Sequence, residues 1–205
     1  GRDLRRTREG VPAVDDAVTY PEDLAALRTA GAELLPFDTL HDARLPAVDG
    51  LFIGGGFPES NGAALAANAG FRDSLRRAID AGLPVYAECG GLMYLARSLS
   101  WRGHTWEMVG AIPADVVMQG KPVGKGYVKL AETGEHPWGA GEGSVVHAHE
   151  FHYSHLENVA PGLRYAWDVE RGEGTGLVPC LRSDSAARRV GRILLRYEAD
   201  VHARW

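Results

Sequence analysis

A cysteine at a predicted strand-to-helix turn is the residue of this sequence best suited to covalent chemistry. The apolar run 85–87 favours a short strand, Cys89 follows it with two glycines after it, and residues 92–96 favour a helix. A thiol at such a turn lies beside free backbone amides, which favour the thiolate over the thiol. The sequence therefore presents Cys89 as a candidate nucleophile, and burial as a small apolar side chain is the alternative.

Three consecutive glycines follow another apolar run. Residues 49–53 predict a buried strand that leads directly into Gly54, Gly55 and Gly56. Such a turn can be merely flexible, or it can bring backbone amides close to an oxygen of a ligand, as in an oxyanion hole. It lacks the lysine of a phosphate-binding loop and the spacing of a dinucleotide-binding motif. Because a candidate nucleophile follows the next predicted strand, we favour the amide-donor role for this turn.

Histidines crowd one segment of the second half, where four of them fall within nine positions: His147, His149, His152 and His155. Zinc binding is one candidate role for such a cluster. However, no neighbouring cysteine pair completes a familiar ligand spacing, and the alternation at 147 and 149 suggests a strand. We therefore expect no metal site in this chain.

The bulk composition indicates a globular protein. The chain has 205 residues, of which 45% are hydrophobic and 24% charged, and its formal net charge is −5. This acidity gives no basic footprint for nucleic acid, and no apolar segment is long enough to span a membrane. The charged opening does not resemble a signal peptide, so we expect a cytoplasmic protein. We divide it into a tail or linker stub, 1–10, and one domain, 11–205.

Predicted strands and helices alternate through the first half. The strands are expected at 11–18, 32–35, 49–53 and 85–87, and the helices at 20–31, 63–68 and 71–81. This alternation predicts a doubly wound, mostly parallel α/β sheet whose site lies at the carboxyl ends of the strands. Beyond Ser98, β-type runs separated by Gly- and Pro-containing turns predict antiparallel strands that extend or flank the sheet.

Three segments, in this order, resemble the glutaminase half of the cobyrinic acid a,c-diamide synthases. They are Leu-Phe-Ile-Gly-Gly-Gly-Phe-Pro-Glu at 51–59, Tyr-Ala-Glu-Cys-Gly-Gly-Leu-Met-Tyr-Leu at 86–95 and His-Glu-Phe-His-Tyr-Ser at 149–154. That family is of the cobyrinate/cobyric acid type of class I glutamine amidotransferases. The resemblance extends from about Tyr20 to the C-terminus, and it implies a flavodoxin-like, cysteine-dependent domain.

The resemblance assigns roles to individual residues. Cys89 matches the nucleophile, which would attack the side-chain amide of glutamine and form a thioester as ammonia leaves. Backbone amides of Gly90 and of the triple-glycine turn would hold the oxyanion. His202 matches the C-terminal histidine that activates the thiol. Glu88 lies in the motif, but on an extended strand it points away from Cys89, so we expect it to orient the site rather than act as a base.

The chain departs from the family pattern near its C-terminus. The family run is of the type Ala-Ser-Tyr-x-His-x-His, and in the segment 198–204 only His202 and its place near the end agree. Arg204 stands where many class I amidotransferases have a glutamate. We therefore expect a Cys-His dyad rather than a triad, with His149 or His152 as the alternative base.

The resemblance also implies a partner. Family members carry an ATP-dependent synthetase domain that activates two acetate carboxylates of a tetrapyrrole, and ammonia from glutamine converts them to the a and c amides. This sequence has no Walker-type segment, so we expect ATP and Mg²⁺ only in a synthetase domain or subunit, and no cofactor here. That partner would hold most of the tetrapyrrole, and the substrates that the resemblance implies for this family and its near relatives are cobyrinate, hydrogenobyrinate, sirohydrochlorin and siroheme.

Two other function classes stay open on the sequence. A non-catalytic, tetrapyrrole-binding or regulatory module of the same fold could hold ligand carboxylates with the histidine-rich strand and with Lys121 and Lys125. A cysteine peptidase could share the same strand-turn-helix architecture at the nucleophile, and it would need no synthetase. Presence of the cysteine, the glycine turn and a downstream histidine together favours the glutaminase.

Overall fold

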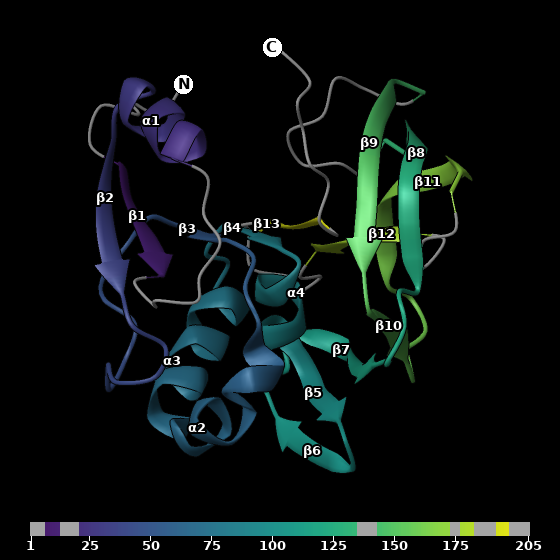
Figure 1. Cartoon of the computed structure of the whole chain (residues 1–205). Helices are drawn as coiled ribbons and strands as arrows, with labels where there is room; N and C mark the ends of the chain where they lie inside the picture. The colour runs from purple at the N-terminus through teal and green to yellow at the C-terminus, as the bar shows by residue number, and fades with distance from the viewer. Residues whose placement is uncertain (1–6, 13–20, 135–142, 173–176, 183–191, 197–205) are drawn as a thin grey trace.

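The computed structural model describes residues 7–12, 21–134, 143–172, 177–182 and 192–196, which form two sheets and a few short helices (Figure 1). The larger sheet contains β1 (Thr7–Pro12), β2 (Ala32–Phe37), β3 (Gly50–Ile53), β4 (Val85–Glu88), β8 (Gly124–Glu132), β9 (Val145–His152), β11 (Arg164–Arg171), β12 (Leu177–Arg182) and β13 (Arg192–Arg196). The smaller sheet contains β5 (Ala96–Trp101), β6 (His104–Glu107), β7 (Ile112–Met118) and β10 (Ser154–Glu157). The helices are α1 (Pro21–Thr29), η1 (Pro58–Ser60), α2 (Gly62–Ala67), α3 (Ala69–Asp80) and α4 (Gly90–Leu95).

The larger sheet is parallel in one half and antiparallel in the other. Its strand order is β2-β1-β3-β4-β13-β12-β11-β8-β9. The first five strands in this order run parallel, and from β13 onward each neighbour runs antiparallel to the last. This arrangement confirms the expected α/β fold with an antiparallel extension. It also makes β4, β11 and β9 run in one direction. Their carboxyl ends therefore lie at the same edge of the sheet, the edge formed by the carboxyl ends of the parallel strands.

The helix α3 packs its apolar face into the core beside the parallel half. Phe71, Leu75 and Ile79 are buried, at the spacing of one helix face. The Phe71 ring stacks on Phe37 of β2 with centroids 5.5 Å apart. The Asn68 side chain caps the helix by accepting from the Phe71 amide. The predicted helix at 71–81 is thus confirmed, with its start at Ala69.

The buried Arg72 ties α3 to the smaller sheet. Its guanidinium donates to the carbonyls of Met108, at 2.9 Å, and Ala66, at 3.0 Å. It also lies 3.2 Å from the Glu107 carboxylate at the end of β6. A buried cation needs such partners because its desolvation is otherwise unfavourable. This contact fixes α2 and α3 beside the smaller sheet, whose first strand, β5, directly follows α4 in the chain.

The first strand lies earlier than the sequence predicts. We placed a strand at 11–18 after a tail at 1–10, whereas β1 spans Thr7–Pro12, and residues 13–20 lie outside the described residues. Residues 7–10 are polar and so do not resemble a strand. They form one because β1 pairs on both sides, with β2 and with β3. Strand β2 also continues through Pro36, which an outermost strand tolerates because one side of it needs no hydrogen-bond donors.

Three further differences lie in the second half. The chain enters β5 immediately after α4, whereas the sequence predicted β-type runs only beyond Ser98. Strand β10 was also missed. The third difference is Cys180, which lies within β12. These strands are short and partly polar. Whether they form therefore depends more on the strands they pair with than on their local composition.

A cluster of polar contacts around Asp115 joins β5, β7 and the loop after β10. Arg97 donates twice to the Asp115 carboxylate, at 2.8 and 2.7 Å, and Ser98 and Asn158 each donate once. The Arg97 hydrogen bonds, followed by those of Asn158 and Ser98, hold the pKa of Asp115 well below its usual range, although partial burial opposes this. The ionised carboxylate therefore stabilises the smaller sheet.

We expect Asp115→Asn to weaken the dependence of stability on acid pH. Because the pKa of Asp115 is lowered in the folded state, its contribution is fully present above the unfolded pKa of about 4 and is lost as pH falls below it. Urea unfolding at pH 7 and at pH 3 should give a smaller difference for the variant than for the parent chain. Asp73→Asn, at an exposed position of α3, is the control, and an unchanged difference in Asp115→Asn would contradict the prediction.

No helix in the described part of the chain is long and apolar enough to cross a membrane.

Candidate active site

Cys89 occupies the turn between β4 and α4, as the sequence predicts. Its backbone has φ of 42° and ψ of −108°, a conformation that residues other than glycine rarely adopt. The residue precedes the first residue of α4, and its carbonyl accepts from the Met93 amide at 3.1 Å. The thiol is only half-buried. The fold therefore holds this cysteine in a strained pose at a strand end, a feature typical of functional sites.

The triple-glycine turn lies directly against the start of α4. A Cβ atom added to Gly90 would lie 2.4 Å from the Gly56 carbonyl oxygen and 2.8 Å from the Gly56 nitrogen. One added to Gly91 would lie 2.7 Å from the Ile53 oxygen and 2.8 Å from the Gly54 oxygen. Only glycine allows backbone segments to approach so closely. The two turns that the sequence placed on one edge are thus in contact.

A pocket of about 70 Å³ opens where the two turns meet. Both turns line it, together with residues of α2, α4 and the loop after β2: Thr39, Leu40, Ile53, Gly54, Gly55, Gly56, Phe57, Pro58, Asn61, Leu65, Gly90, Gly91 and Tyr94. Thr39, Asn61 and Tyr94 line the pocket although no sequence motif marked them as candidates. Thr39 follows the carboxyl end of a parallel strand, and that position alone could have marked it as near the site.

Glu88 is buried and contacts its own strand. Its carboxylate accepts a short hydrogen bond from the Tyr86 hydroxyl, two residues earlier and so on the same face of β4. The Tyr86 ring stacks on Phe52 of β3, with centroids 5.2 Å apart. This chain of contacts runs from β3 to the residue before Cys89, and the orienting role of Glu88 stays a prediction.

Burial raises the pKa of two polar groups near the site, the Glu59 carboxyl and the Tyr94 hydroxyl. Burial raises the pKa of Glu59, in η1 just after the glycine turn, and its backbone hydrogen bond opposes this weakly. Burial likewise raises the pKa of the Tyr94 hydroxyl, although the positive charge of Arg72 opposes the rise. The Tyr94 hydroxyl has no hydrogen-bond partner among the described residues. Tyr94 lines the pocket and Glu59 does not, so the pocket wall presents a buried, neutral hydroxyl at Tyr94.

The alternative base His152 is buried in a network of its own. Its Nδ1 lies 2.8 Å from the Ser154 carbonyl oxygen, and because a carbonyl only accepts, Nδ1 carries the proton. Its Nε2 lies 3.5 Å from the Glu150 carboxylate, which is also buried. Gly124 leaves the room for this pair, since a Cβ atom there would lie 2.2 Å from the His152 Nε2. These contacts give His152 a structural role in the packing of β8 and β9.

The other two candidate histidines are His149 and His202. His149 lies in β9, where its backbone pairs with Tyr127 of β8. His202 lies outside the described residues, but the strand that precedes it is described. The last residue of β13, Arg196, pairs with Glu88 in the parallel ladder, immediately before Cys89. The chain therefore leaves β13 at the same edge of the sheet as the nucleophile candidate.

No group of three or more His, Cys, Asp or Glu side chains within the described residues could hold a metal ion. The arrangement can instead support covalent chemistry by a thiol. It combines a candidate nucleophile on a strained turn, backbone groups of two glycine turns in contact and a pocket at their junction.

Solved structures of glutamine amidotransferases share this fold. The Thermotoga maritima PurLQS structure matches 84% of this chain and 86% of its own with a TM-score of 0.61 and 15% identity. A structure described as a glutamine amidotransferase matches 91% of this chain and 87% of its own with a TM-score of 0.60 and 20% identity. These likenesses establish the class I glutamine amidotransferase fold.

Sequence comparison identifies the family. The model of the CobB/CobQ-like glutamine amidotransferase domain matches residues 10–190. The cobyrinate a,c-diamide synthase of Magnetococcus marinus is 44% identical over 164 residues, which are 79% of this chain and 35% of the relative. That of Methanothermobacter thermautotrophicus is 40% identical over 172 residues, which are 83% of this chain and 37% of the relative. The chain thus spans about a third of the length of these relatives, and it belongs to the CobB/CobQ-like glutamine amidotransferase domain family.

Proposed function

We propose that this chain hydrolyses glutamine through a thioester on Cys89 and supplies the ammonia to an ATP-dependent synthetase. The observation that carries the proposal is the contact between the strained Cys89 turn and the triple-glycine turn, with a pocket at their junction. The family of the chain supports the same reaction.

The proposed reaction has two covalent steps. The Cys89 thiolate attacks the side-chain carbonyl carbon of glutamine, and backbone amides of Gly90 and of the triple-glycine turn, Gly54 to Gly56, stabilise the oxyanion. The C–N bond then breaks as a histidine gives a proton to the nitrogen, so ammonia leaves and a thioester remains. Water attacks the thioester, which releases glutamate and regenerates the thiol.

We assign the proton transfer to His202. The segment from Arg196 to His202 is six residues long and starts beside Glu88, and an extended chain covers roughly 3.3–3.6 Å per residue, so the histidine can reach back to Cys89. His152 already has partners for both ring nitrogens. A base on β9 is therefore the less favoured assignment.

The names and lengths of the relatives support a proposal for the molecule that accepts the ammonia. Relatives at 40–44% identity are named cobyrinate a,c-diamide synthases and extend far beyond the matched segment. We propose that a synthetase part of this kind binds ATP and Mg²⁺ and activates the a and c acetate groups of cobyrinate or a related tetrapyrrole. Sirohydrochlorin or siroheme is the alternative acceptor.

Labelling by the glutamine analogue diazo-oxonorleucine tests the glutaminase. We expect peptide mass spectrometry to find one adduct, on Cys89 and not on Cys180. We expect His202→Ala to slow labelling roughly a hundredfold, the usual size of a general-base effect. If labelling is slowed in His152→Ala and not in His202→Ala, the base is on β9 instead. Failure to label Cys89, when iodoacetamide still reaches it, would contradict the glutaminase and favour a non-catalytic binding module.

A further inference from the structure

Exposed aromatic and lysine side chains gather at one end of the β8–β9 hairpin. We call this group the aromatic–lysine surface, and it consists of Lys121, Lys125, Tyr127, Phe151 and Tyr153. The Tyr127 side chain is 83% exposed, and those of Phe151 and Tyr153 are 39% and 38% exposed. Phe151 and Tyr153 meet edge to face with centroids 5.5 Å apart. Large aromatic side chains this exposed are unusual on a surface that faces only water.

The strand ladder places Lys125, Tyr127 and Phe151 on one face. Lys125 is directly opposite Phe151, and Tyr127 is opposite His149. Residues that alternate with them, such as Val128, Ala148 and His152, are buried on the other face. Among the described elements, the helices lie beside the parallel half of the sheet and the smaller sheet, and none covers β8 and β9 (Figure 1). No described helix or strand therefore covers the outer face of this hairpin.

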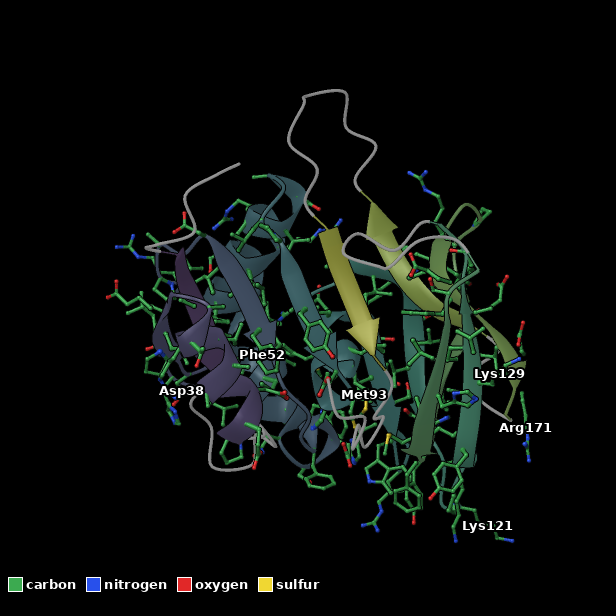
Figure 2. The ribbon with its side chains drawn as sticks, turned by 90° about the horizontal axis from the view of Figure 1, so that it is seen from above. Asp38, Phe52, Met93, Lys121, Lys129 and Arg171 are labelled. Carbon is green, nitrogen blue, oxygen red and sulfur yellow. The ribbon has the colours of Figure 1, made fainter. Side chains whose placement is uncertain are left out.

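The aromatic–lysine surface lies at the edge of the sheet that carries Cys89. Strands β9 and β4 run in the same direction, so Phe151, near the end of β9, and Cys89, just after β4, are at the same edge. Lys121 and Lys125 flank the start of the antiparallel β8, which is also at that edge. Figure 2 shows Lys121 beyond the strand ends, on the side toward which β13 points.

The charges at this surface are uncompensated within the described part of the chain. Lys129, on the same strand, forms an ion pair with Glu170 at 2.5 Å. Lys121 and Lys125 are exposed and make no such pair with a described residue, although the chain as a whole carries a net charge of −5. Two free lysines beside exposed aromatic rings match a partner surface that is apolar at its centre and acidic at its rim.

We propose that the aromatic–lysine surface docks the synthetase part of the amide ligase, an inference that rests on the proposed function. Ammonia released at Cys89 must pass to the activated carboxylate without escaping to solvent, so the synthetase has to cover this edge of the sheet. The relatives carry roughly two thirds of their length outside the matched segment, which supplies such a partner. Aromatic residues at the centre of an interface contribute most of its binding energy.

Lysine acetylation tests the docking directly. The whole chain would replace the matched segment of the Magnetococcus marinus synthase, and acetic anhydride labelling of this chimera would be compared with that of the chain alone. We expect Lys121 and Lys125 to become at least tenfold less reactive in the chimera, while Lys129, farther from the edge, keeps its reactivity. The double variant Phe151→Ser/Tyr153→Ser should restore the reactivity of both lysines.

A functional measurement separates docking from catalysis. In the chimera, Lys121→Glu/Lys125→Glu should lower glutamine-dependent amide synthesis at least tenfold and leave synthesis from added ammonia unchanged. Arg77→Glu, at an exposed position of α3, is the matched control and should change neither. Diazo-oxonorleucine labelling of Cys89 in the chain alone should be the same in all these variants, and its absence in the parent chain would count against the glutaminase itself.

Two results would overturn the docking proposal. One is equal acetylation of Lys121 and Lys125 in the chimera and the chain alone, with glutamine-dependent synthesis intact in the charge-reversed variant. The other is protection of both lysines by added cobyrinate in the chain alone, because the surface would then bind the tetrapyrrole rather than a protein.

Discussion

Replacing Cys89 with serine is expected to lower glutamine hydrolysis at least about a thousandfold, because the serine hydroxyl is a far weaker nucleophile than a thiolate near neutral pH. Serine is close to cysteine in size, so the β4–α4 turn should keep its conformation. Glutamate release, measured with the synthetase present, reports the loss, and urea unfolding checks that the variant remains folded. Cys180→Ser, in β12, is the matched control and should retain full activity.

Cys89→Gly separates the chemistry from the strain. The cysteine sits at φ of 42°, where glycine is tolerated and a side chain costs of order 1–3 kcal/mol. We expect the glycine variant to be inactive yet at least as stable as the parent chain in urea. Substantial glutaminase activity in either Cys89 variant would exclude Cys89 as the nucleophile, and a large loss of stability in Cys89→Gly would show that the turn is not strained.

The parts of the site that the sequence predicts are those in which spacing along the chain decides the position in space. Cys89 follows β4 and Gly54 follows β3, and parallel neighbouring strands end at one edge. That rule predicts that the two turns meet. The period of two along a strand likewise predicts that Glu88 points away from Cys89, and in the structure its carboxylate contacts Tyr86.

The parts that the sequence does not predict depend on partners far away in the chain. Thr39 and Tyr94 reach the pocket only because the loop after β2 and the helix α4 meet there. The polar residues at 7–10 form a strand because β2 and β3 flank them. The sequence leaves His152 open as a base or a ligand, because it does not show that Gly124 of the distant β8 leaves the room in which the His152 ring meets Glu150. In each case a residue's role is set by neighbours that local composition does not reveal.

Gly90→Ala should disrupt the site more severely than any other small substitution near it. The new methyl group would lie 2.4 Å from the Gly56 oxygen and 2.8 Å from both the carbonyl carbon and the nitrogen of Gly56. All three are backbone atoms, so no side chain can rotate away, and one of the two turns must move. Such overpacking costs typically 1–3 kcal/mol, and we expect a loss of about 3 kcal/mol in urea unfolding.

The same displacement should abolish the glutaminase even where Gly90→Ala remains folded. Oxyanion donors act only within a few tenths of an ångström of their required place, because hydrogen bonds to the developing charge weaken steeply with distance and angle. We expect diazo-oxonorleucine to label Cys89 at least a hundredfold more slowly in this variant, the usual effect of losing one such donor. Gly120→Ala is the matched control, since a methyl group there meets no atom within 4 Å. Normal labelling in a folded Gly90→Ala chain would mean that the two turns do not have to touch for catalysis, and the oxyanion role of the triple-glycine turn would then be wrong.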